Sequence, residues 1–244
     1  MKPTDQAPRS ITLVLPYYDN PGMLRRQQET WAAFPPGLRA RLHVIVVDDC
    51  SPRSPALPHV VPTGVASFTL YRTGKDVRWN WIFCRNLGVA LAPTPWVLLT
   101  DIDHLLPVET LRRLLDGDLK PDVAYRFSRV DAPDLTPYKP HPNTWCLTRA
   151  LFDRVGGYDE RFSGFYGSDG DFRRRIQDTA RKVAILPEVM IRVPRGVIPD
   201  ASTTTYTRKE KYDKRAVHRI LAEREHVVRW RPLRLSFPYA RLLP

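Results

Sequence analysis

Two aspartates directly follow a stretch of sequence that predicts a buried strand. Trp96 to Thr100 is a short apolar run, and Asp101 and Asp103 come immediately after it. Carboxylates spaced by two positions can converge on a hard divalent cation, which takes oxygen ligands and commonly keeps waters or phosphate oxygens. Such a cation could bridge the pyrophosphate of a nucleotide and neutralise charge on the departing diphosphate. The pattern is also compatible with one aspartate capping the next helix and the other facing solvent.

A second acidic pair ends an earlier apolar run. Asp48 and Asp49 follow Leu42 to Val47, and a carboxylate there can accept hydrogen bonds from a base or a ribose. Further along, Arg85 offers a fork of donors to a phosphate, and Gly88 allows close backbone approach. Alternatively, Asp49 caps a local turn and Arg85 pairs with a surface acid.

These residues need a sheet to bring them together. In the first half, apolar and β-branched runs alternate with helical patterns, which predicts a parallel α/β sheet with ligands at the carboxyl ends of its strands. We expect strands at Ser10 to Tyr17, 42–47, Ser67 to Tyr71 and 96–100, and helices from Pro21 to the Pro35-Pro36 pair and over Trp81 to Leu91.

In the second half, the sequence predicts helices, strands, a loop and a tail. We expect helices at Pro107 to Leu115, Arg149 to Val155 (ended by Gly156-Gly157), Asp171 to Thr179 and Arg208 to Val228, strands at Asp122 to Val130 and Thr144 to Leu147, a loop over the site from Asp131 to Pro142, and a proline-punctuated tail.

Composition narrows the class of protein. The 244 residues are 43% hydrophobic and 26% charged, which excludes collagen-like, disordered and disulfide-scaffold classes. Cys50, Cys84 and Cys146 are widely spaced, which fits a reducing compartment. The first residues lack the apolar core of a signal peptide, and no apolar run approaches the length of a membrane helix. We therefore expect a soluble cytoplasmic protein.

The net charge of +12 is concentrated at one end. Residues 1–171 carry 20 Lys and Arg against 19 Asp and Glu, whereas residues 172–244 carry 18 against 7. A basic end of this kind favours a polyanionic partner such as nucleic acid, an anionic membrane surface or an acidic polymer, although it can also serve solubility alone.

In this order the motifs resemble a known group of enzymes. ITLVLPYYDN, VIVVDDCS, CRNLGVALA and WVLLTDID are similar to the nucleotide-sugar half of family 2 glycosyltransferases with the GT-A fold. GGYDERFSGFYGSDGDFRRRI resembles the acceptor-side motif of galactosyltransferase-like enzymes, and the resemblance spans about residues 10–180. DVRWNWIFCRNLG and TDIDH also resemble phage-encoded members, for which the location would be the host cytoplasm.

The resemblance implies an α/β GT-A domain, a Rossmann-like mixed sheet flanked by helices, over residues 1–200, with a donor half at about 10–105 and an acceptor half at about 106–200. Residues 201–244 would be a basic C-terminal helix and tail. It implies that a nucleotide sugar, with a UDP-sugar favoured, contacts Pro16, Tyr18, Asp48, Asp49, Arg85, Asn86, Asp101 and Asp103.

The resemblance also implies roles for a metal and a base. Asp101 and Asp103 would hold Mn²⁺ or Mg²⁺, and Asp169 would be the base that takes the proton from the acceptor hydroxyl in an inverting reaction. Residue 168, usually Glu in such enzymes, is Ser here. The histidine that often completes the metal site is missing from 188–196, where Arg192 and Arg195 could instead stabilise the diphosphate.

Further residues are candidates for other contacts. His104 adjoins the aspartates, and we expect it to point elsewhere as an ordinary turn histidine. Tryptophans 79, 81 and 145 could present faces to a sugar or base, or simply pack in the core. The acceptor-binding candidates are Trp145, Tyr166, Asp171, Arg173 and Arg195.

Three functions remain open on these residues. The first is transfer of a sugar to a hydroxyl, with a hydroxymethylated pyrimidine in phage DNA as the favoured acceptor, because Tyr206, Tyr212, Trp230 and Phe237 lie among the basic C-terminal residues. The second is transfer to a cell-surface glycan or a lipid-linked acceptor at an anionic membrane. The third is a non-catalytic nucleic-acid-binding protein on the same fold.

Overall fold

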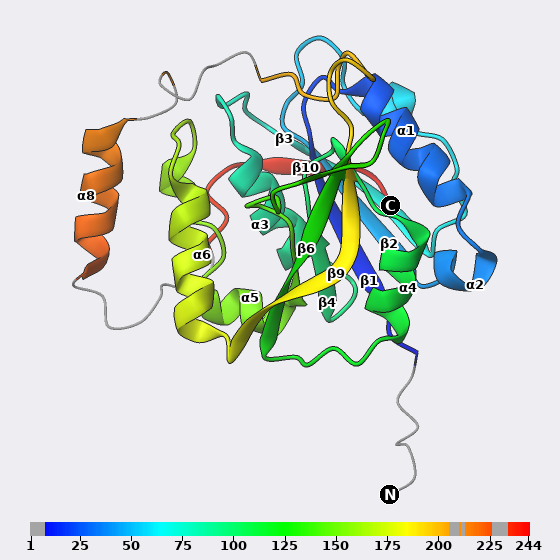
Figure 1. The fold of residues 1–244 in the computed structure, drawn as a ribbon. Coiled ribbons are helices and arrows are strands. Elements are labelled where there is room, and N and C mark those ends of the chain that lie inside the picture. The colour runs from blue at the N-terminus through cyan, green and yellow to red at the C-terminus, as the bar shows by residue number, and fades with distance from the viewer. Residues whose placement is uncertain (1–7, 205–209, 211–212, 226–233) are drawn as a thin grey trace, which may run out of the picture.

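A computed structural model describes residues 8–204, 210, 213–225 and 234–244. Its strands lie in one mixed sheet in the order β10-β3-β2-β1-β4-β8-β6-β9-β5, with β7 paired to β6 (Figure 1). The strands are β1 (Ile11–Tyr17), β2 (Leu42–Asp48), β3 (Ser67–Thr73), β4 (Trp96–Leu99), β5 (His104–Leu105), β6 (Val123–Asp131), β7 (Thr136–Tyr138), β8 (Trp145–Thr148), β9 (Lys182–Arg192) and β10 (Tyr239–Leu243).

Helices lie on both faces of this sheet (Figure 1). The α-helices are α1 (Pro21–Ala32), α2 (Pro36–Arg39), α3 (Trp81–Ala90), α4 (Val108–Asp116), α5 (Arg149–Val155), α6 (Ser168–Thr179) and α8 (Lys214–Glu225), and the short 3-10 helices are η1 (Leu57–His59) and η2 (Glu160–Phe162). No helix of the described part is long and apolar enough to cross a membrane.

The first half of the chain is the predicted parallel unit. β1 pairs in parallel with β2 on one side and β4 on the other, and β3 pairs in parallel with β2. In this register Tyr17 lies beside Asp48, so the acidic residues that follow β2 and β4 reach the same edge of the sheet. The strands and helices predicted up to residue 100 are all confirmed.

Two glycines in these helices have clear structural roles. A Cβ on Gly88 would lie 2.3 Å from a methyl group of Val14, so glycine lets α3 pack directly on β1. The close approach expected at Gly88 is therefore helix against strand rather than backbone against a phosphate. Gly156 ends α5 as predicted, in the left-handed conformation at φ 80°.

The second half adds antiparallel strands. β8 pairs antiparallel with β4, and the long β9 runs parallel to β6. The expected loop from Asp131 to Pro142 contains β7, which folds back on β6. Helix α6 begins at Ser168, earlier than predicted, which places Asp169 in its first turn.

The C-terminal segment is partly integrated into this body. β10 pairs antiparallel with β3 and forms one edge of the sheet, so the predicted tail ends as a strand of the main sheet. Phe237 packs edge-on against Phe83 of α3, with ring centroids 5.2 Å apart. The remaining aromatic residues predicted to contact a polyanion, Tyr206, Tyr212 and Trp230, lie outside the described residues, as do both ends of the predicted 208–228 helix.

Candidate active site

A pocket of about 420 Å³ lies where β1, β2 and β4 end. This is the edge at which α/β sheets bind ligands. Its lining residues come from six segments of the chain and are Pro16, Tyr17, Tyr18, Asp19, Asn20, Asp49, Pro52, Arg53, Arg78, Trp79, Asn80, Trp81, Asp101, Ile102, Asp103, Asn143, Ala201, Ser202, Thr203 and Thr204. Five of the eight predicted donor-binding residues are among them: Pro16, Tyr18, Asp49, Asp101 and Asp103.

The acidic pair after β2 divides into two different roles. Asp48 is completely buried, and its carboxylate accepts backbone N–H bonds from Ser51 at 2.7 Å and from Ala56 at 2.9 Å. It shapes the loop after β2 and does not line the pocket, so the structure argues against its predicted contact with a nucleotide. Each of its oxygens accepts one of these bonds, and the side chain is 0% exposed, so it presents no acceptor to the pocket.

Asp49 does face the pocket. Its Oδ2 accepts the backbone N–H of Asn80 at 3.2 Å, whereas Oδ1 is buried without a hydrogen-bond partner in the described part of the chain. Burial raises the pKa of this carboxyl to about 7. Asp49 is thus a carboxyl whose protonation state changes near neutral pH, with one oxygen able to accept a new bond.

Arg85 is a buried partner of Asp101. Its side chain is 0% exposed; one terminal nitrogen donates to the carboxylate of Asp101, and the other donates to the carbonyl of Asn143 at 2.6 Å and to the hydroxyl of Tyr158 at 3.1 Å. The guanidinium also lies over the ring of Trp81, 4.6 Å from its centroid. These contacts replace the predicted one to a phosphate, because Arg85 does not line the pocket.

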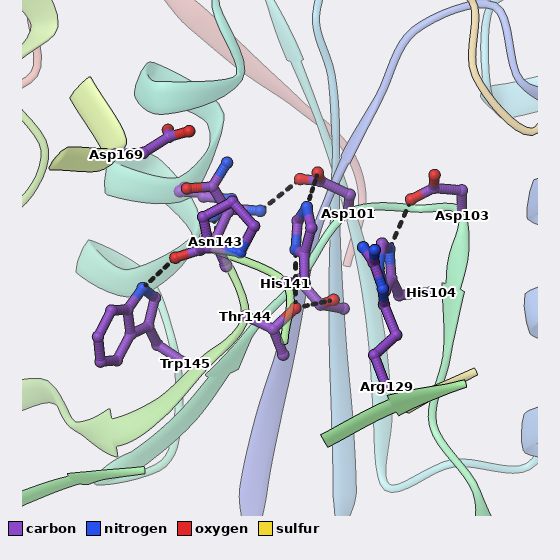
Figure 2. Close-up of polar contacts among 12 residues, drawn as sticks. Asp101, Asp103, His104, Arg129, His141, Asn143, Thr144, Trp145 and Asp169 are labelled. Atoms are coloured by element: carbon purple, nitrogen blue, oxygen red, sulfur yellow. Dashed lines mark hydrogen bonds and ion pairs between the residues drawn. The ribbon is translucent and has the colours of Figure 1, made fainter. Parts of the chain in front are cut away.

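Asp101 has a cationic or polar partner for each oxygen. Nε2 of His141 lies 3.3 Å from Oδ2, and Figure 2 shows the His141 ring below the Asp101 carboxylate. Partial burial of Asp101 acts to raise its pKa, but Arg85 and His141 outweigh it and hold the pKa well below its usual range. Asp101 is therefore ionised and strongly held, with 36% of its side chain exposed at the pocket.

Asn86 has a structural role. Its amide donates to the carbonyl of Tyr158 and to the carboxylate of Glu160, both at 2.8 Å, and its oxygen accepts the N–H of Tyr158 at 2.8 Å. All of these bonds are buried or nearly so, and Asn86 does not reach the pocket. The predicted donor contact is thus replaced by a link between α3 and the segment that precedes α6.

His104 is not the turn histidine that we expected. It lies in β5, is 2% exposed, and its Nδ1 is 2.7 Å from Oδ1 of Asp103. Its Nε2 faces Arg129 at 3.5 Å, so Nδ1 carries the proton and donates to Asp103. Its ring contacts that of His141 at a centroid distance of 4.2 Å.

His141 completes this arrangement from an unexpected place. Burial lowers its pKa, which favours the neutral ring. Its Nδ1 lies 3.0 Å from the hydroxyl of Thr144, which lies 2.9 Å from that of Thr100. Nε2–H can then donate to Asp101 while Nδ1 accepts from Thr144. The two histidines thus support the two aspartates from below (Figure 2).

The carboxylates fit a divalent cation only in part. No group of three or more Cys, His, Asp and Glu side chains in the described residues is arranged to hold a metal ion. Asp101 is occupied by Arg85 and His141, whereas Asp103, which lines the pocket, is contacted within the described residues through Oδ1 alone. The donor set fits a cation that takes one protein carboxylate and completes its shell with phosphate oxygens and water.

Asp169 adjoins the pocket through Asn143. It does not line the pocket, but Asn143 does, and the Asn143 side chain acts to lower the pKa of Asp169. The hydroxyl of Ser168 donates to the Asp169 carboxylate at 3.4 Å. Burial raises the pKa of Asp169, and nearby Asp101 adds to this, against the opposing effect of Arg85. Figure 2 shows Asp169 at the start of α6, on the side of Asn143 away from Asp103.

The acceptor-binding candidates fall into different environments. Trp145 is buried in the core and donates its ring N–H to the carbonyl of Pro142 at 3.0 Å. Asp171 is buried in an ion pair with Arg175, with N–O distances of 3.0 and 2.8 Å. Neither can contact an acceptor in this arrangement. Both were predicted to do so, and both instead stabilise the fold around α6.

The other three candidates are accessible. Tyr166 is half-buried and stacks on Trp79, with centroids 5.9 Å apart and planes 5° from parallel. Arg173 is exposed on α6. Arg195 is exposed and donates to the carbonyls of Ser202 and Thr204, so it holds a pocket-lining segment. Arg192, also suggested for the diphosphate, pairs with Asp131 at 2.5 Å and does not line the pocket.

His141 and Asn143 were missed in the sequence. They lie in HPNTW, directly before an apolar strand, within a stretch where prolines suppress any periodic signal. A polar pair that precedes a strand antiparallel to β4 reaches the same edge as Asp101. The sequence alone could not reveal this, because it depends on the antiparallel pairing of β8 with β4.

The fold is that of the GT-A glycosyltransferases. TarS of S. aureus, residues 1–349 in complex with UDP-GlcNAc, matches with a TM-score of 0.61 and 14% identity over 89% of this chain and 73% of that chain. GalNAc-T7 with UDP, GalNAc and Mn²⁺ matches with a TM-score of 0.59 and 12% identity over 78% of this chain and 45% of that one.

A third solved structure is more similar in sequence. The mannosyltransferase PcManGT from Pyrobaculum calidifontis, in complex with GDP-Man and Mn²⁺, matches with a TM-score of 0.56 and 23% identity over 80% of this chain and 62% of that chain. No protein-family model and no curated protein matches the sequence.

Proposed function

We propose that this protein is a glycosyltransferase that takes its sugar from a nucleotide sugar. The observation that carries the proposal is the convergence of Asp49, Asp101 and Asp103 on one pocket at the carboxyl ends of β1, β2 and β4. The fold supports it, because the similar structures include complexes with UDP, UDP-GlcNAc and GDP-Man. A UDP-sugar remains the favoured donor.

The pocket has suitable chemistry for the parts of such a donor. Oδ1 of Asp49 can accept a hydrogen bond from the base or ribose, and Tyr18 and Trp79 offer flat faces nearby. A divalent cation, when bound with Asp103, would neutralise charge on the diphosphate leaving group. The ionised Asp101 faces the same end of the pocket and adds little repulsion, because the buried Arg85 balances its charge.

The reaction that we propose is an inverting transfer. Asp169 accepts the proton of an acceptor hydroxyl while the oxygen of that hydroxyl forms a bond to the anomeric carbon. The bond from that carbon to the diphosphate oxygen breaks, and the nucleoside diphosphate leaves with the electron pair. The raised pKa of Asp169 supports this role, because it brings the carboxylate nearer the basicity that proton transfer at neutral pH needs.

Equilibrium binding tests the donor part of the proposal. UDP, GDP, CDP and their common sugar conjugates, each with Mn²⁺, should be titrated by calorimetry into the wild-type protein and into Asp49→Ala. We expect binding of one nucleotide class and at least about tenfold weaker binding by the variant, in line with loss of a buried hydrogen bond. Absence of binding by every nucleotide would contradict the proposal.

DNA is the acceptor that we favour, because of which side chains of α8 are buried and which are exposed. Its apolar residues Val217 and Ile220 are buried against the body, while Lys214, Arg215 and Arg219 are exposed. An interfacial membrane helix needs a free apolar face, so the described part of α8 suits a phosphate backbone better than a lipid surface. A surface glycan or lipid-linked acceptor is the alternative.

A labelled transfer assay separates these acceptors. Hydroxymethylated DNA, unmodified DNA and membrane extract should each be offered with the donor that binds. Label in hydroxymethylated DNA alone supports the DNA acceptor, whereas label in membrane extract alone contradicts it. Nucleic-acid binding without any transfer would favour the non-catalytic alternative.

A further inference from the structure

A short segment far along the chain forms one wall of the pocket. Residues 200–204, which we call the strap, follow β9 and return from the acceptor half to the start of α1, where the gold trace in Figure 1 passes beside the helix. Ala201 to Thr204 line the pocket, and Ala201 is buried. Asp200 does not line it. The strap therefore combines four pocket-lining residues with one residue, Asp200, that lies outside the pocket.

Asp200 fixes the strap to the first turn of α1. Its carboxylate accepts the backbone N–H of Gly22 at 2.5 Å and that of Met23 at 3.0 Å. The residue preceding α1, Asn20, makes no side-chain cap and instead donates its amide to the carbonyl of Asp200 at 2.5 Å. The orphan N–H groups of a helix start need such partners, and the helix dipole favours a negative charge there.

Two further bonds hold the same segment. The hydroxyl of Thr203 donates to the carbonyl of Tyr18 at 2.8 Å, and Arg195 donates to the carbonyls of Ser202 and Thr204. Tyr18 and Asn20 themselves line the pocket. The strap and the β1–α1 connection are thus joined into a single wall, and Asp200 makes the most bonds across the joint.

Gly22 is adapted to this contact. A Cβ at residue 22 would lie 2.9 Å from Oδ1 of Asp200 and 3.0 Å from Oδ2. Since Gly22 lies inside the first turn of α1, alanine would favour the helix itself while displacing the carboxylate. The helix and the strap contact can therefore be perturbed separately.

We propose that Asp200 is a positioning residue that sets the affinity for the nucleotide donor by holding the strap against α1. The inference rests on the proposed function. When the Asp200 contacts are lost, the strap occupies its wall position for a smaller fraction of the time. The apparent dissociation constant rises in proportion, because only that fraction binds the donor fully. Once the donor is bound, the reacting groups are unchanged, so kcat changes little.

The test compares two variants that disrupt the contact between Asp200 and α1 with one matched control, all in the full chain. Asp200→Asn removes the charge, and Gly22→Ala displaces the carboxylate while raising the intrinsic helix propensity of residue 22. Thr148→Ala is the control, because Thr148 caps α5 by accepting the N–H of Leu151 at 3.2 Å and does not line the donor pocket. UDP and GDP are the probes, with Mn²⁺ present, and thermal unfolding is recorded alongside binding.

We expect Asp200→Asn and Gly22→Ala to bind the nucleotide at least about fivefold more weakly, which is the scale of a lost helix cap. KM for the donor should rise while kcat stays nearly constant. Thr148→Ala should lower the melting temperature without changing affinity. Unchanged affinity in Gly22→Ala and Asp200→Asn, with wild-type binding intact, overturns this inference alone. Failure of the wild type to bind UDP, GDP or any other nucleoside diphosphate overturns the proposed function and this inference with it.

Discussion

The guanidinium of Arg85 donates directly to the carboxylate of Asp101, so that a completely buried cation supports an anion at the edge of the pocket. The pair joins helix α3 to the end of β4. Burying an arginine is costly unless its charge is compensated, and Asp101 supplies the compensating charge. The position of the Asp101 carboxylate is thereby set from inside the core.

Loss of the Asp101 charge should destabilise the protein. Asp101→Asn leaves Arg85 buried without its counter-ion, and we expect a loss of about 2 kcal/mol in the free energy of unfolding, discounted from the fully buried case because Asp101 is partly exposed. Asp118→Asn, at an exposed aspartate paired with Lys120, is the control and should change little. Urea unfolding measures both; equal stability of the two variants would count against the pair.

The same pair predicts a pH dependence. Because the folded-state pKa of Asp101 lies below its unfolded value, its stabilising effect is fully present above the unfolded pKa, near 4, and is lost as the pH falls further. The stability difference between wild type and Asp101→Asn should therefore shrink as the pH falls below about 4. A difference that stays constant from pH 7 to pH 3 would contradict this.

The contribution of Asp49 to stability should depend on pH in the opposite direction. Its folded-state pKa of about 7 exceeds its unfolded value, so the folded protein binds the extra proton and becomes less stable as the pH rises toward 7. Asp49→Asn lacks this charge, and its stability relative to wild type should increase from pH 5 to pH 8 by about 1 kcal/mol or more. Thermal melts across that range measure the difference, and a flat comparison would refute the raised pKa.

Cation binding should depend on the nucleotide. Since Asp103 is the carboxylate with an oxygen left over, the protein alone should bind Mn²⁺ weakly, and UDP or GDP should strengthen binding by about tenfold or more. Asp103→Asn should abolish that increase. Paramagnetic resonance of free Mn²⁺ gives the affinities. Tight Mn²⁺ binding without a nucleotide would show that the protein builds a fuller site than we describe.

The general-base role of Asp169 can be separated from binding. Asp169→Asn should lower transfer by about 10² to 10⁴-fold while nucleotide affinity is nearly unchanged, because the residue adjoins the pocket without lining it. Asp178→Asn, an exposed position on the same helix, is the control. Nucleotide affinity lost together with activity would instead place Asp169 in the donor site.

Local sequence patterns predicted most of the sheet and the position of the pocket. Apolar runs that end in acidic pairs identified β2 and β4, and the parallel register then brought Asp49, Asp101 and Asp103 to one edge. What the patterns did not distinguish was the direction of each carboxylate. Asp48 and Asp49 are adjacent in sequence, yet one is enclosed by backbone N–H groups and the other opens to the pocket.

The other differences come from contacts between distant segments. Arg85 and Asn86 were predicted to contact the nucleotide sugar, but both are buried and bind residues of the acceptor half. His141 reaches Asp101 only because β7 folds the proline-rich segment back onto β6. Asp200 reaches α1 across most of the length of the chain. Periodicity within one segment carries no information about such partners.

The most direct measurement is of sugar transfer itself. The wild-type protein, Asp169→Asn and Asp178→Asn should each be incubated with Mn²⁺ and the labelled nucleotide sugar that binds, with hydroxymethylated DNA, unmodified DNA and membrane extract as acceptors. We expect release of the nucleoside diphosphate with transfer of label by the wild type and Asp178→Asn, and almost none by Asp169→Asn. A glycosyltransferase with Asp169 as its base would be contradicted if no acceptor is labelled although the nucleotide sugar binds, or if Asp169→Asn transfers as fast as the wild type.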